Sequence, residues 1–430
     1  MIVTFVEAIE DKLKLINVVN LELDLLILIL YFYLCIPLGI VFNSLKCKNQ
    51  RILYNLFFGL FFTMIITKEW FIYIFIWAIL IYFVSKIFKD PYYPIFLVGF
   101  IILSYCHVYR LMYDYLSWKM DYNCIQMMIT ARYIYYAVDK SKIKEHDSFL
   151  MFLSYVFMYP NLYLAPLPYV SFVNLIIRKE DFTHYSIKPA LINLFKAILF
   201  TAGELFIRPK FDTEVYFSEN WTHYNLLQKV LITQAVSVVL RFQYFTAFKH
   251  SQAAMDAFGI TYNPETKKCD RFPVADYHYD MEKNIMKKTM MWNSNVQLWL
   301  RYCFYDKLNH LFGSHTYYVT FLISCIWHGF YMTYYLFFVF WAISVQICKY
   351  FYKAQSKFYF IPEKIRHAIC WFWSCMTIDH FATGMKVLDW NKAIEFHQSV
   401  NWIIHIQALV LFAFFAITGF GQQKKIKKKD

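Results

Sequence analysis

Long runs of apolar residues recur from Leu21 to Phe420 and constrain the fold more than any other feature of the sequence. About 20 such residues span the hydrocarbon core of a bilayer as a helix. Spans must be helical, because lipid offers backbone groups no other partner. No soluble half can be separated from these runs. We therefore expect an integral membrane protein that crosses the bilayer many times.

The predicted fold is an all-α, polytopic transmembrane bundle of about 10–11 spans in one domain, residues 1–430. The stretch 317–347 is too long for one straight span, so we expect it to tilt or to continue past the bilayer. Three prolines in 148–172 predict a broken or re-entrant element buried in protein. The predicted spans are 22–42, 52–66, 69–87, 93–110, 148–172, 189–207, 225–245, 317–347, 365–385 and 402–420.

Two segments are less apolar than the spans. Residues 121–138 contain Asp121, Gln126 and Arg132, and residues 249–310 begin with a polar loop and continue as an amphipathic helix. The polar loop runs from Asn263 to Asp270. Amphipathic helices of this kind lie in the membrane interface, and we expect that position for both segments.

Positive charge exceeds negative charge, with 43 Lys and Arg against 30 Asp and Glu. The excess lies in loops and in the tail 421–430, where basic residues record orientation and contact anionic lipid. Nucleic-acid binding is therefore not expected. Lys427 and Lys428 have the arrangement of a dilysine retrieval signal. This predicts an endoplasmic reticulum protein with a cytosolic C-terminus; the alternative is a plain basic tail on anionic lipid.

Two further features concern signal-peptide cleavage and N-glycosylation. Acidic residues precede the first apolar run, which lacks a small-residue cleavage site, so we expect an uncleaved span rather than a signal peptide. The sequon Asn220-Trp221-Thr222 either faces the lumen or is not used.

Apart from His328 in the span 317–347, the cysteines and histidines show no pattern of a metal or catalytic site. The ten cysteines occur singly, without CxxC or Cys/His metal spacing, and are expected to be small hydrophobic residues of helices. Asp379, His380 and His405 are interpreted as structural or vestibule residues. Neither a metal nor a cofactor is predicted. GxSxG, P-loop and HExxH motifs are absent, which gives no support to a serine hydrolase, an NTPase or a zincin.

His328 lies in the middle of an apolar span. At helical spacing it shares a stripe with Ser324, Tyr331 and Tyr335, so one wall of this helix can form hydrogen bonds. A buried, neutral histidine is a competent general base. The alternative is a core histidine bonded to a neighbouring helix.

A second polar stripe lies in residues 291–308, where an amide could act on a reacting group. Asparagine cannot be a base, but its amide can orient a hydroxyl or donate to an oxyanion. The alternative is an interfacial helix with tryptophan at the headgroup level. One face carries Thr289, Asn293, Gln297 and Arg301, and another carries Trp292, Val296, Trp299 and Cys303.

These two segments resemble motifs of the membrane-bound O-acyltransferase family, and within it of the lysophospholipid acyltransferases. The likeness is carried by WNSNVQLWL at 292–300 and by WHG at 327–329. Asn293 and His328 match the paired asparagine and histidine of the family, with a suitable separation of 35 residues. Similar segments, such as DSFLMFLSYVFMYPNLYLAPLPYVSFVN, extend the resemblance over residues 115–345. Asn123-Cys124 and Ala165 depart from the family pattern.

The resemblance implies a helical bundle around an acyl-transfer tunnel, an acyl-CoA co-substrate as donor and a lysophospholipid acceptor. It also implies that His328 removes the proton of the sn-2 hydroxyl while Asn293 orients that hydroxyl or stabilises the oxyanion. Lysophosphatidylinositol is favoured narrowly over lysophosphatidylcholine. Alternatives are a family member that acts on a neutral lipid or a secreted protein, and a non-enzymatic transporter. The side chains expected to contact substrate are Trp292, Gln297, Arg301, Ser324, Trp327, Tyr331 and Tyr335.

Overall fold

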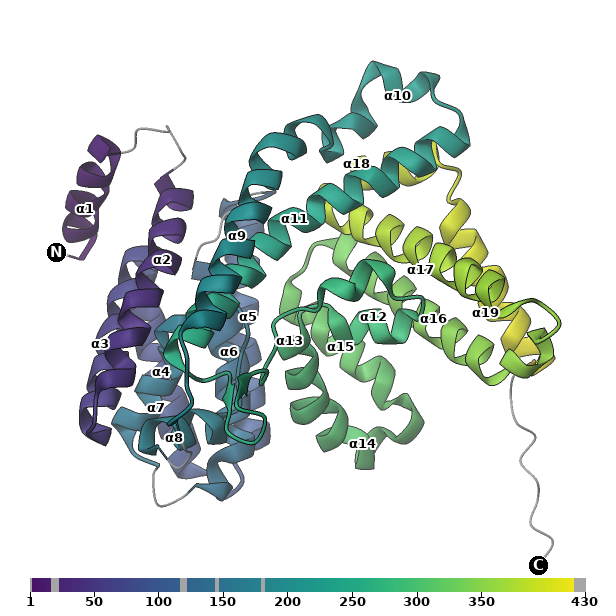
Figure 1. Cartoon of the computed structure of the whole chain (residues 1–430). Helices are drawn as coiled ribbons and strands as arrows, with labels where there is room; N and C mark the ends of the chain where they lie inside the picture. The colour runs from purple at the N-terminus through teal and green to yellow at the C-terminus, as the bar shows by residue number, and fades with distance from the viewer. Residues whose placement is uncertain (1, 17–22, 117–121, 144–146, 179–181, 421–430) are drawn as a thin grey trace, which may run out of the picture. The chain divides into compact units, whose positions relative to one another are not determined.

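The computed structural model describes residues 2–16, 23–116, 122–143, 147–178 and 182–420, and most of them are helical (Figure 1). The chain forms two compact units that alternate along the sequence. Unit 1 comprises Met1–Phe200, Phe245–Val274 and Asn293–Ser314, and unit 2 comprises Thr201–Tyr244, Ala275–Trp292 and His315–Asp430. A single domain over the whole chain stays a prediction.

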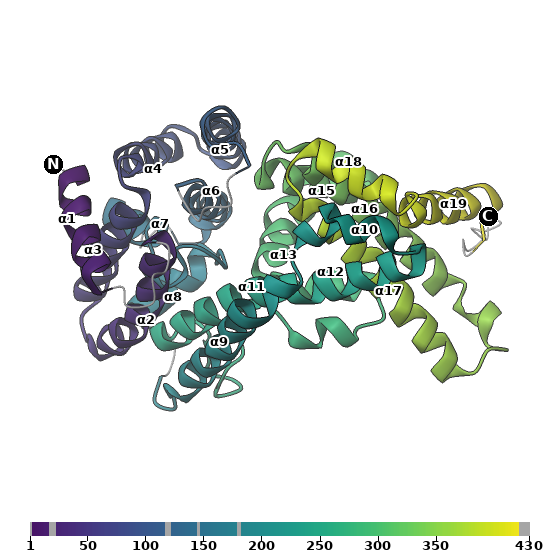
Figure 2. The same ribbon diagram turned by 90° about the horizontal axis from the view of Figure 1, so that it is seen from above.

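Unit 1 combines long apolar helices with several short ones. Within it α2 packs on α3, α3 on α7, α4 on α5 and α5 on α6, and Figure 2 shows the neighbouring positions of α4, α5 and α6. Helices α9 and α11 each run from one unit into the other in sequence. The helices with residues in unit 1 are α1 (Ile2–Ile16), α2 (Leu23–Ser44), α3 (Lys48–Thr67), α4 (Trp70–Ile87), α5 (Tyr92–Tyr113), α6 (Tyr122–Asp139), α7 (Phe149–Val156), α8 (Tyr169–Ile177), α9 (Lys188–Ile207), α11 (Leu226–Phe258), α13 (Ser294–Leu300) and α14 (Asp306–Phe312).

Helix α6 is the most enclosed helix of unit 1, and the prediction that this segment lies in the interface is wrong. Almost every side chain of Tyr122–Asp139 is buried, including Gln126 and Arg132. The helix is covered by α4, α5, α7 and α8. Its polar groups therefore face protein rather than lipid headgroups. Asp121 lies outside the described residues.

The proline-rich stretch 148–172 is broken, as predicted. Helix α7 ends at Val156, a 3-10 turn covers Tyr159–Asn161, and α8 begins at Tyr169. Carbonyl groups at such a break lack helical partners. The guanidinium of Arg132 supplies donors instead, to Asn161 O at 2.6 Å, to Asn161 Oδ1 at 2.9 Å, to Met158 O at 3.3 Å and to the carbonyl of Val156. One buried arginine thus connects α6 to the broken element.

Helix α3 approaches the end of α7 at Gly59. A Cβ atom at this position would lie 1.6 Å from the carbonyl oxygen of Phe157. Only glycine permits so close an approach of the two backbones.

The polar loop predicted from Asn263 to Asp270 is a short hairpin. Strand β1 (Tyr262–Asn263) pairs antiparallel with β2 (Lys268–Cys269) after the end of α11. The buried carboxylate of Asp256 accepts hydrogen bonds from Gln252 at 2.8 Å, from Thr261 at 2.6 Å and from Asn193 at 2.8 Å. These bonds fix the start of the hairpin against α9 and α11.

Unit 2 has an apolar core between α12, α16, α17 and α19, and Figure 1 shows α16 and α17 side by side. A buried ion pair reinforces it: Arg241 of α11 contacts Asp379 of α17 at 2.6 Å and Asp280 at 2.7 Å. The helices that lie wholly in unit 2 are α10 (Glu219–His223), α12 (Ile285–Met291), α15 (Thr316–His328), α16 (Met332–Lys353), α17 (Glu363–Lys386), α18 (Trp390–Ser399) and α19 (Ile403–Thr418).

The sequence predicts ten spans, but fewer helices of the structure are long and apolar enough to be spans. In the described part of the chain seven are long and apolar enough to cross a membrane, or eight if the bent pair α18–α19 counts as one span. The stretch 148–172 is broken, and α17, predicted as span 365–385, contains Asp379 and His380. The stretch 317–347 is not one long helix, because Gly329 divides it into α15 and α16.

Helix α9 has few buried side chains, whereas α6 has many. Of its side chains only those of Ala190 and Ala197 are buried, whereas Phe195 and Leu199 are among its exposed apolar residues. A surface of this kind is suited to contact with lipid chains.

Candidate active site

Asn293 occupies a break between two helices. Helix α12 ends at Met291, α13 begins at Ser294, and Asn293 between them has φ 44° and ψ 56°. Asparagine adopts this left-handed conformation more readily than most residues. The amide of Ser294 donates to the carbonyl of Val274 at 2.8 Å, which holds the start of α13. The predicted polar stripe through Thr289, Asn293, Gln297 and Arg301 is wrong, because the helix is not continuous.

The side-chain oxygen of Asn293 is buried and has no hydrogen-bond partner among the described residues. The backbone carbonyl of the same residue accepts from the amides of Val296 at 2.9 Å and Gln297 at 3.2 Å. A buried acceptor without a donor costs about 1–3 kcal/mol. Asn293 therefore presents an acceptor that a bound hydroxyl could satisfy.

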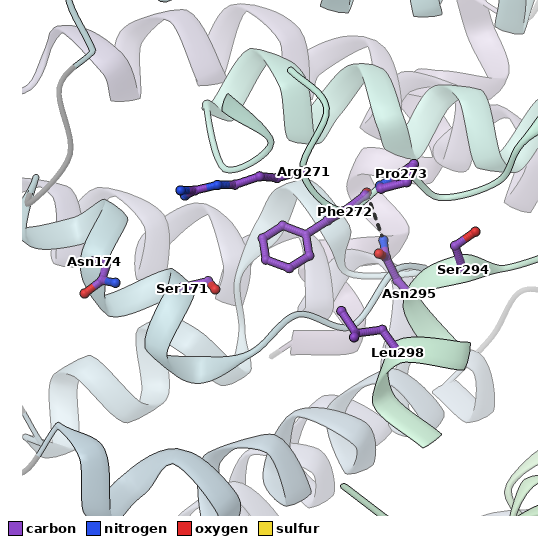
Figure 3. Close-up of a pocket in the computed structure, with 8 residues that line it drawn as sticks. All are labelled: Ser171, Asn174, Arg271, Phe272, Pro273, Ser294, Asn295 and Leu298. Atoms are coloured by element: carbon purple, nitrogen blue, oxygen red, sulfur yellow. Dashed lines mark hydrogen bonds between the residues drawn. The ribbon is translucent and has the colours of Figure 1, made fainter. Parts of the chain in front are cut away.

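A cavity of about 540 Å³ adjoins this break within unit 1 (Figure 3). Three segments line it: α8, the loop after the hairpin and the first turns of α13. The loop is held by a hydrogen bond from the Asn295 side chain to the carbonyl of Phe272, 3.3 Å long and dashed in Figure 3. Hydroxyl, amide and guanidinium groups in one cavity suit a polar or anionic group. The lining residues are Ser171, Asn174, Arg271, Phe272, Pro273, Ser294, Asn295 and Leu298.

No residue predicted from the sequence lines this cavity. Ser171, Asn174 and Arg271 lie in the stretch 115–345 that resembles the family, but none of them was predicted to contact substrate. Ser294 and Asn295 lie next to Asn293 in the motif WNSNVQLWL, and this was the signal available for them.

His328 also lies at a helix end. It is the last residue of α15, and Gly329 follows with φ 133°, a conformation that a residue with a side chain rarely adopts. The imidazole is half-buried among aromatic rings, with centroid distances of 4.9 Å to Trp327, 5.1 Å to Phe338 and 6.1 Å to Tyr334. These rings cover part of the imidazole with apolar surface.

The stripe predicted around His328 is only partly present. Ser324 lies one turn before His328 on α15 and is buried. Tyr331 and Tyr335 lie beyond Gly329, so they do not share a helix face with His328. The spacing argument failed because it assumed an unbroken helix.

The remaining predicted substrate contacts differ in their surroundings. Trp327 and Tyr331 are buried, whereas Tyr335 is half-buried. Trp292 packs in unit 2 against Tyr244 and Tyr279, with centroid distances of 5.2 Å and 5.4 Å. In unit 1, Gln297 is half-buried on α13 and Arg301 is exposed at a π-helical turn.

The π-helical turn Arg301–Tyr305 is stabilised by a polar network that the sequence did not reveal. The hydroxyl of Tyr302 donates to the buried Asp139 carboxylate at 2.5 Å, and Lys142 bonds to Asp139 at 3.0 Å and to Tyr302. Burial and the bond to Asp139 raise the pKa of Tyr302. Burial alone would lower the pKa of Lys142, but its bonds to Tyr302 and Asp139 raise it. Both groups therefore stay protonated at neutral pH. Turns of this type are frequent at functional sites.

The predicted residues form two sets, one in each unit. Asn293, Gln297 and Arg301 belong to unit 1. The set in unit 2 comprises Trp292, Ser324, Trp327, His328, Tyr331 and Tyr335. Joint action of Asn293 and His328, and the tunnel around them, stay predictions.

The family model of the membrane-bound O-acyltransferases matches residues 100–378. This range is most of the chain and includes both Asn293 and His328. The chain belongs to this family. The resemblance predicted over 115–345 is thereby confirmed and extended in both directions.

Three curated relatives of this O-acyltransferase carry names of lysophospholipid or acylglycerophosphatidylinositol acyltransferases, at 22–24% identity. "Lysophospholipid acyltransferase" of Schizosaccharomyces pombe is 24% identical over 388 residues, which are 79% of this chain and 75% of the relative. "Lysophospholipid acyltransferase 2" of Arabidopsis thaliana is 23% identical over 49% of this chain and 48% of its own length. "Membrane-bound acylglycerophosphatidylinositol O-acyltransferase mboat7" of Danio rerio is 22% identical over 49% of this chain and 50% of its own length. The match thus spans about half of the last two relatives.

Proposed function

We propose that this chain is a lysophospholipid acyltransferase of phospholipid remodelling, which transfers an acyl chain from acyl-CoA to the sn-2 hydroxyl of a lysophospholipid. The observation that carries the proposal is the family match over residues 100–378, which contains Asn293 and His328. The names of the relatives from fission yeast and Arabidopsis support the acceptor class.

In the proposed reaction the acceptor hydroxyl oxygen attacks the thioester carbonyl carbon. His328 takes the hydroxyl proton during the attack. Asn293 orients the hydroxyl or stabilises the negative charge that develops on the carbonyl oxygen. An oxygen–carbon ester bond forms, the carbon–sulfur bond breaks, and the CoA thiolate leaves with the proton from His328. No metal or redox cofactor takes part.

Local geometry supports these roles. The buried Asn293 amide oxygen lacks a partner among the described residues, as expected of a group that meets a substrate. The cavity beside it is lined by Arg271, Asn174 and Ser171, which are side chains able to hold a phosphate. Aromatic rings cover part of His328, and such apolar surroundings would limit hydrolysis of the thioester once substrate is bound.

We further propose lysophosphatidylinositol as the preferred acceptor. The form WNSNVQLWL and the zebrafish relative named for acylglycerophosphatidylinositol support this choice. An anionic head group also gains from the positive charge of the chain. The expected result is that membranes containing the protein consume the inositol lysolipid several times faster than the choline or ethanolamine forms. Equal amounts of lysolipids would compete for one unsaturated acyl-CoA, and the products would be resolved by mass spectrometry.

The outcome of this competition tests the head-group assignment separately from the assignment to the lysophospholipid acyltransferases. Faster use of choline or ethanolamine acceptors would contradict the head-group assignment and leave lysophospholipid acylation standing. Acylation of a sterol, a diacylglycerol or a peptide, with no lysolipid used, would contradict the branch assignment. Membranes with His328→Ala protein provide the background from endogenous enzymes.

We also propose residence in the endoplasmic reticulum membrane with a cytosolic C-terminus. The support is the dilysine arrangement of Lys427 and Lys428, which lie outside the described residues. An epitope tag after Asp430 is expected to be digested by protease added to sealed microsomes. Protection of the tag, with a lumenal marker equally protected, would overturn the topology. Escape of a Lys427→Ala, Lys428→Ala variant to later compartments would confirm the retrieval signal, and unchanged location would contradict it.

A further inference from the structure

Three histidines that are far from one another in sequence converge in unit 2. His380 lies on α17, His397 on α18 and His405 on α19. Their exposed fractions are 3%, 1% and 3%. One possible ligand atom of each lies within 4.8 Å of those of the other two. The ring centroids are 4.5–5.3 Å apart.

One ring nitrogen of each histidine in this cluster is not satisfied by the part of the protein that the structure describes. His380 Nε2, His397 Nδ1 and His405 Nδ1 are buried without a hydrogen-bond partner among the described residues. Their surroundings are apolar, since the rings of Phe340, Phe381, Phe396 and Trp402 lie against them. A buried polar atom in such surroundings requires a partner. Three such histidines, with possible ligand atoms within 4.8 Å of one another, indicate a shared ligand.

We propose that His380, His397 and His405 bind one transition-metal ion, and we assign it as Zn²⁺. Neutral imidazole nitrogen is a preferred ligand of zinc, whereas magnesium and calcium require oxygen. With zinc–nitrogen distances of about 2.0–2.1 Å, tetrahedral ligands lie about 3.4 Å apart. The possible ligand atoms lie within 4.8 Å of one another, so binding of the ion would draw the three rings closer together.

The neighbouring carboxylate does not complete the site. Asp379 precedes His380 but is engaged by Arg241 at 2.6 Å. The described residues therefore supply three ligands, and water or a small anion takes the fourth position. Three histidines with one exchangeable position are a known arrangement for zinc.

The ion has a structural task at this place in the fold. Helices α18 and α19 meet at an angle of 79°. Asn401 and Trp402 in this bend have φ of 55° and 51°, which is unusual for residues with side chains. His397 lies before the bend and His405 after it, so the ion would hold both helices to His380 on α17. This role is independent of the proposed acyl transfer.

The first experiment measures bound metal. The full chain is purified in detergent with a tag that lacks histidine, and zinc, copper, iron, nickel and cobalt are determined by mass spectrometry. We expect about one zinc per chain. The His397→Gln, His405→Gln double variant should lose it. His367→Gln is the matched control, because His367 is an exposed histidine of α17 and should leave the zinc content unchanged.

A second measurement keeps the inference testable if the double variant does not fold. Wild-type protein is freed of metal with a chelator and titrated with Co²⁺, which should give the visible bands of a tetrahedral nitrogen site. Chelation should also lower the thermal midpoint of the wild type, and added Zn²⁺ should restore it. Absence of stoichiometric metal together with no cobalt spectrum would overturn the proposal. Equal zinc in the wild type and a folded double variant would overturn it too, because the ion would lie elsewhere.

Discussion

The variant His328→Ala is expected to lose acyl transfer almost completely while it still inserts and purifies as wild type. Removal of a general base typically lowers turnover by about 10²–10⁴-fold. The imidazole is half-buried against the rings of Trp327 and Phe338, and we expect the alanine variant to keep the fold. The measurement is turnover of acyl-CoA and lysolipid with purified protein. His310→Ala, at an exposed position of α14, is the control.

The same experiment includes Asn293. We expect Asn293→Ala to lower turnover by at least about a hundredfold, as for the loss of an oxyanion-hole donor. The double variant should be little worse than either single variant, because residues that act as one unit are not additive. Losses that multiplied would contradict a shared catalytic unit. Appreciable turnover by well-folded His328→Ala protein would contradict its role as base.

Replacement of Arg132 by methionine is expected to destabilise unit 1 severely. The change would leave the carbonyls of Val156, Met158 and Asn161 without their donor. Each unsatisfied buried group costs about 1–3 kcal/mol. The sum is a large part of a typical free energy of unfolding of about 5–15 kcal/mol, although the loss of a desolvated charge offsets some of it.

The measurement for Arg132→Met is the yield of monodisperse protein in detergent and its thermal midpoint. Lys364→Met, at an exposed position of α17, is the control and should behave as wild type. Arg132→Lys should also be unstable, because one ammonium group cannot reproduce the planar fork of donors. A melting profile of Arg132→Met equal to that of the control would contradict the role assigned to this arginine.

Hydropathy predicted most of the long helices but not their ends near the candidate site. The spacing rule that placed Tyr331 and Tyr335 beside His328 assumes a continuous helix, and Gly329 interrupts it. That glycine is a recognised stop signal and could have been read as one. The break at Asn293 had a weaker signal, because asparagine only sometimes adopts the left-handed conformation.

Burial and convergence could not be predicted from local sequence. The residues of α6 have the polarity of an interfacial helix, and only the surrounding helices show that Arg132 is enclosed. His380, His397 and His405 lack any ligand spacing, since three helices and a sharp bend bring them together. By contrast, the prolines of 148–172 act through their own backbone chemistry, and the break they indicated is present.

The contrast between α9 and α6 has a consequence for how this chain can diverge. Half of the side chains of α9 are exposed, among them Phe195 and Leu199, and at such positions any apolar side chain of similar size serves lipid equally well. Exchanges of one apolar residue for another are therefore expected to be neutral at these positions. Such exchanges preserve the hydropathy of the helix but not the identity of its residues. On α6, Gln126 and Arg132 are enclosed, and Arg132 is bonded to the broken element 148–172, so we expect its exchange to be costly. Among related chains we therefore expect residue identity to persist on enclosed polar helices such as α6. Exposed apolar positions such as those of α9 should keep only their hydropathy.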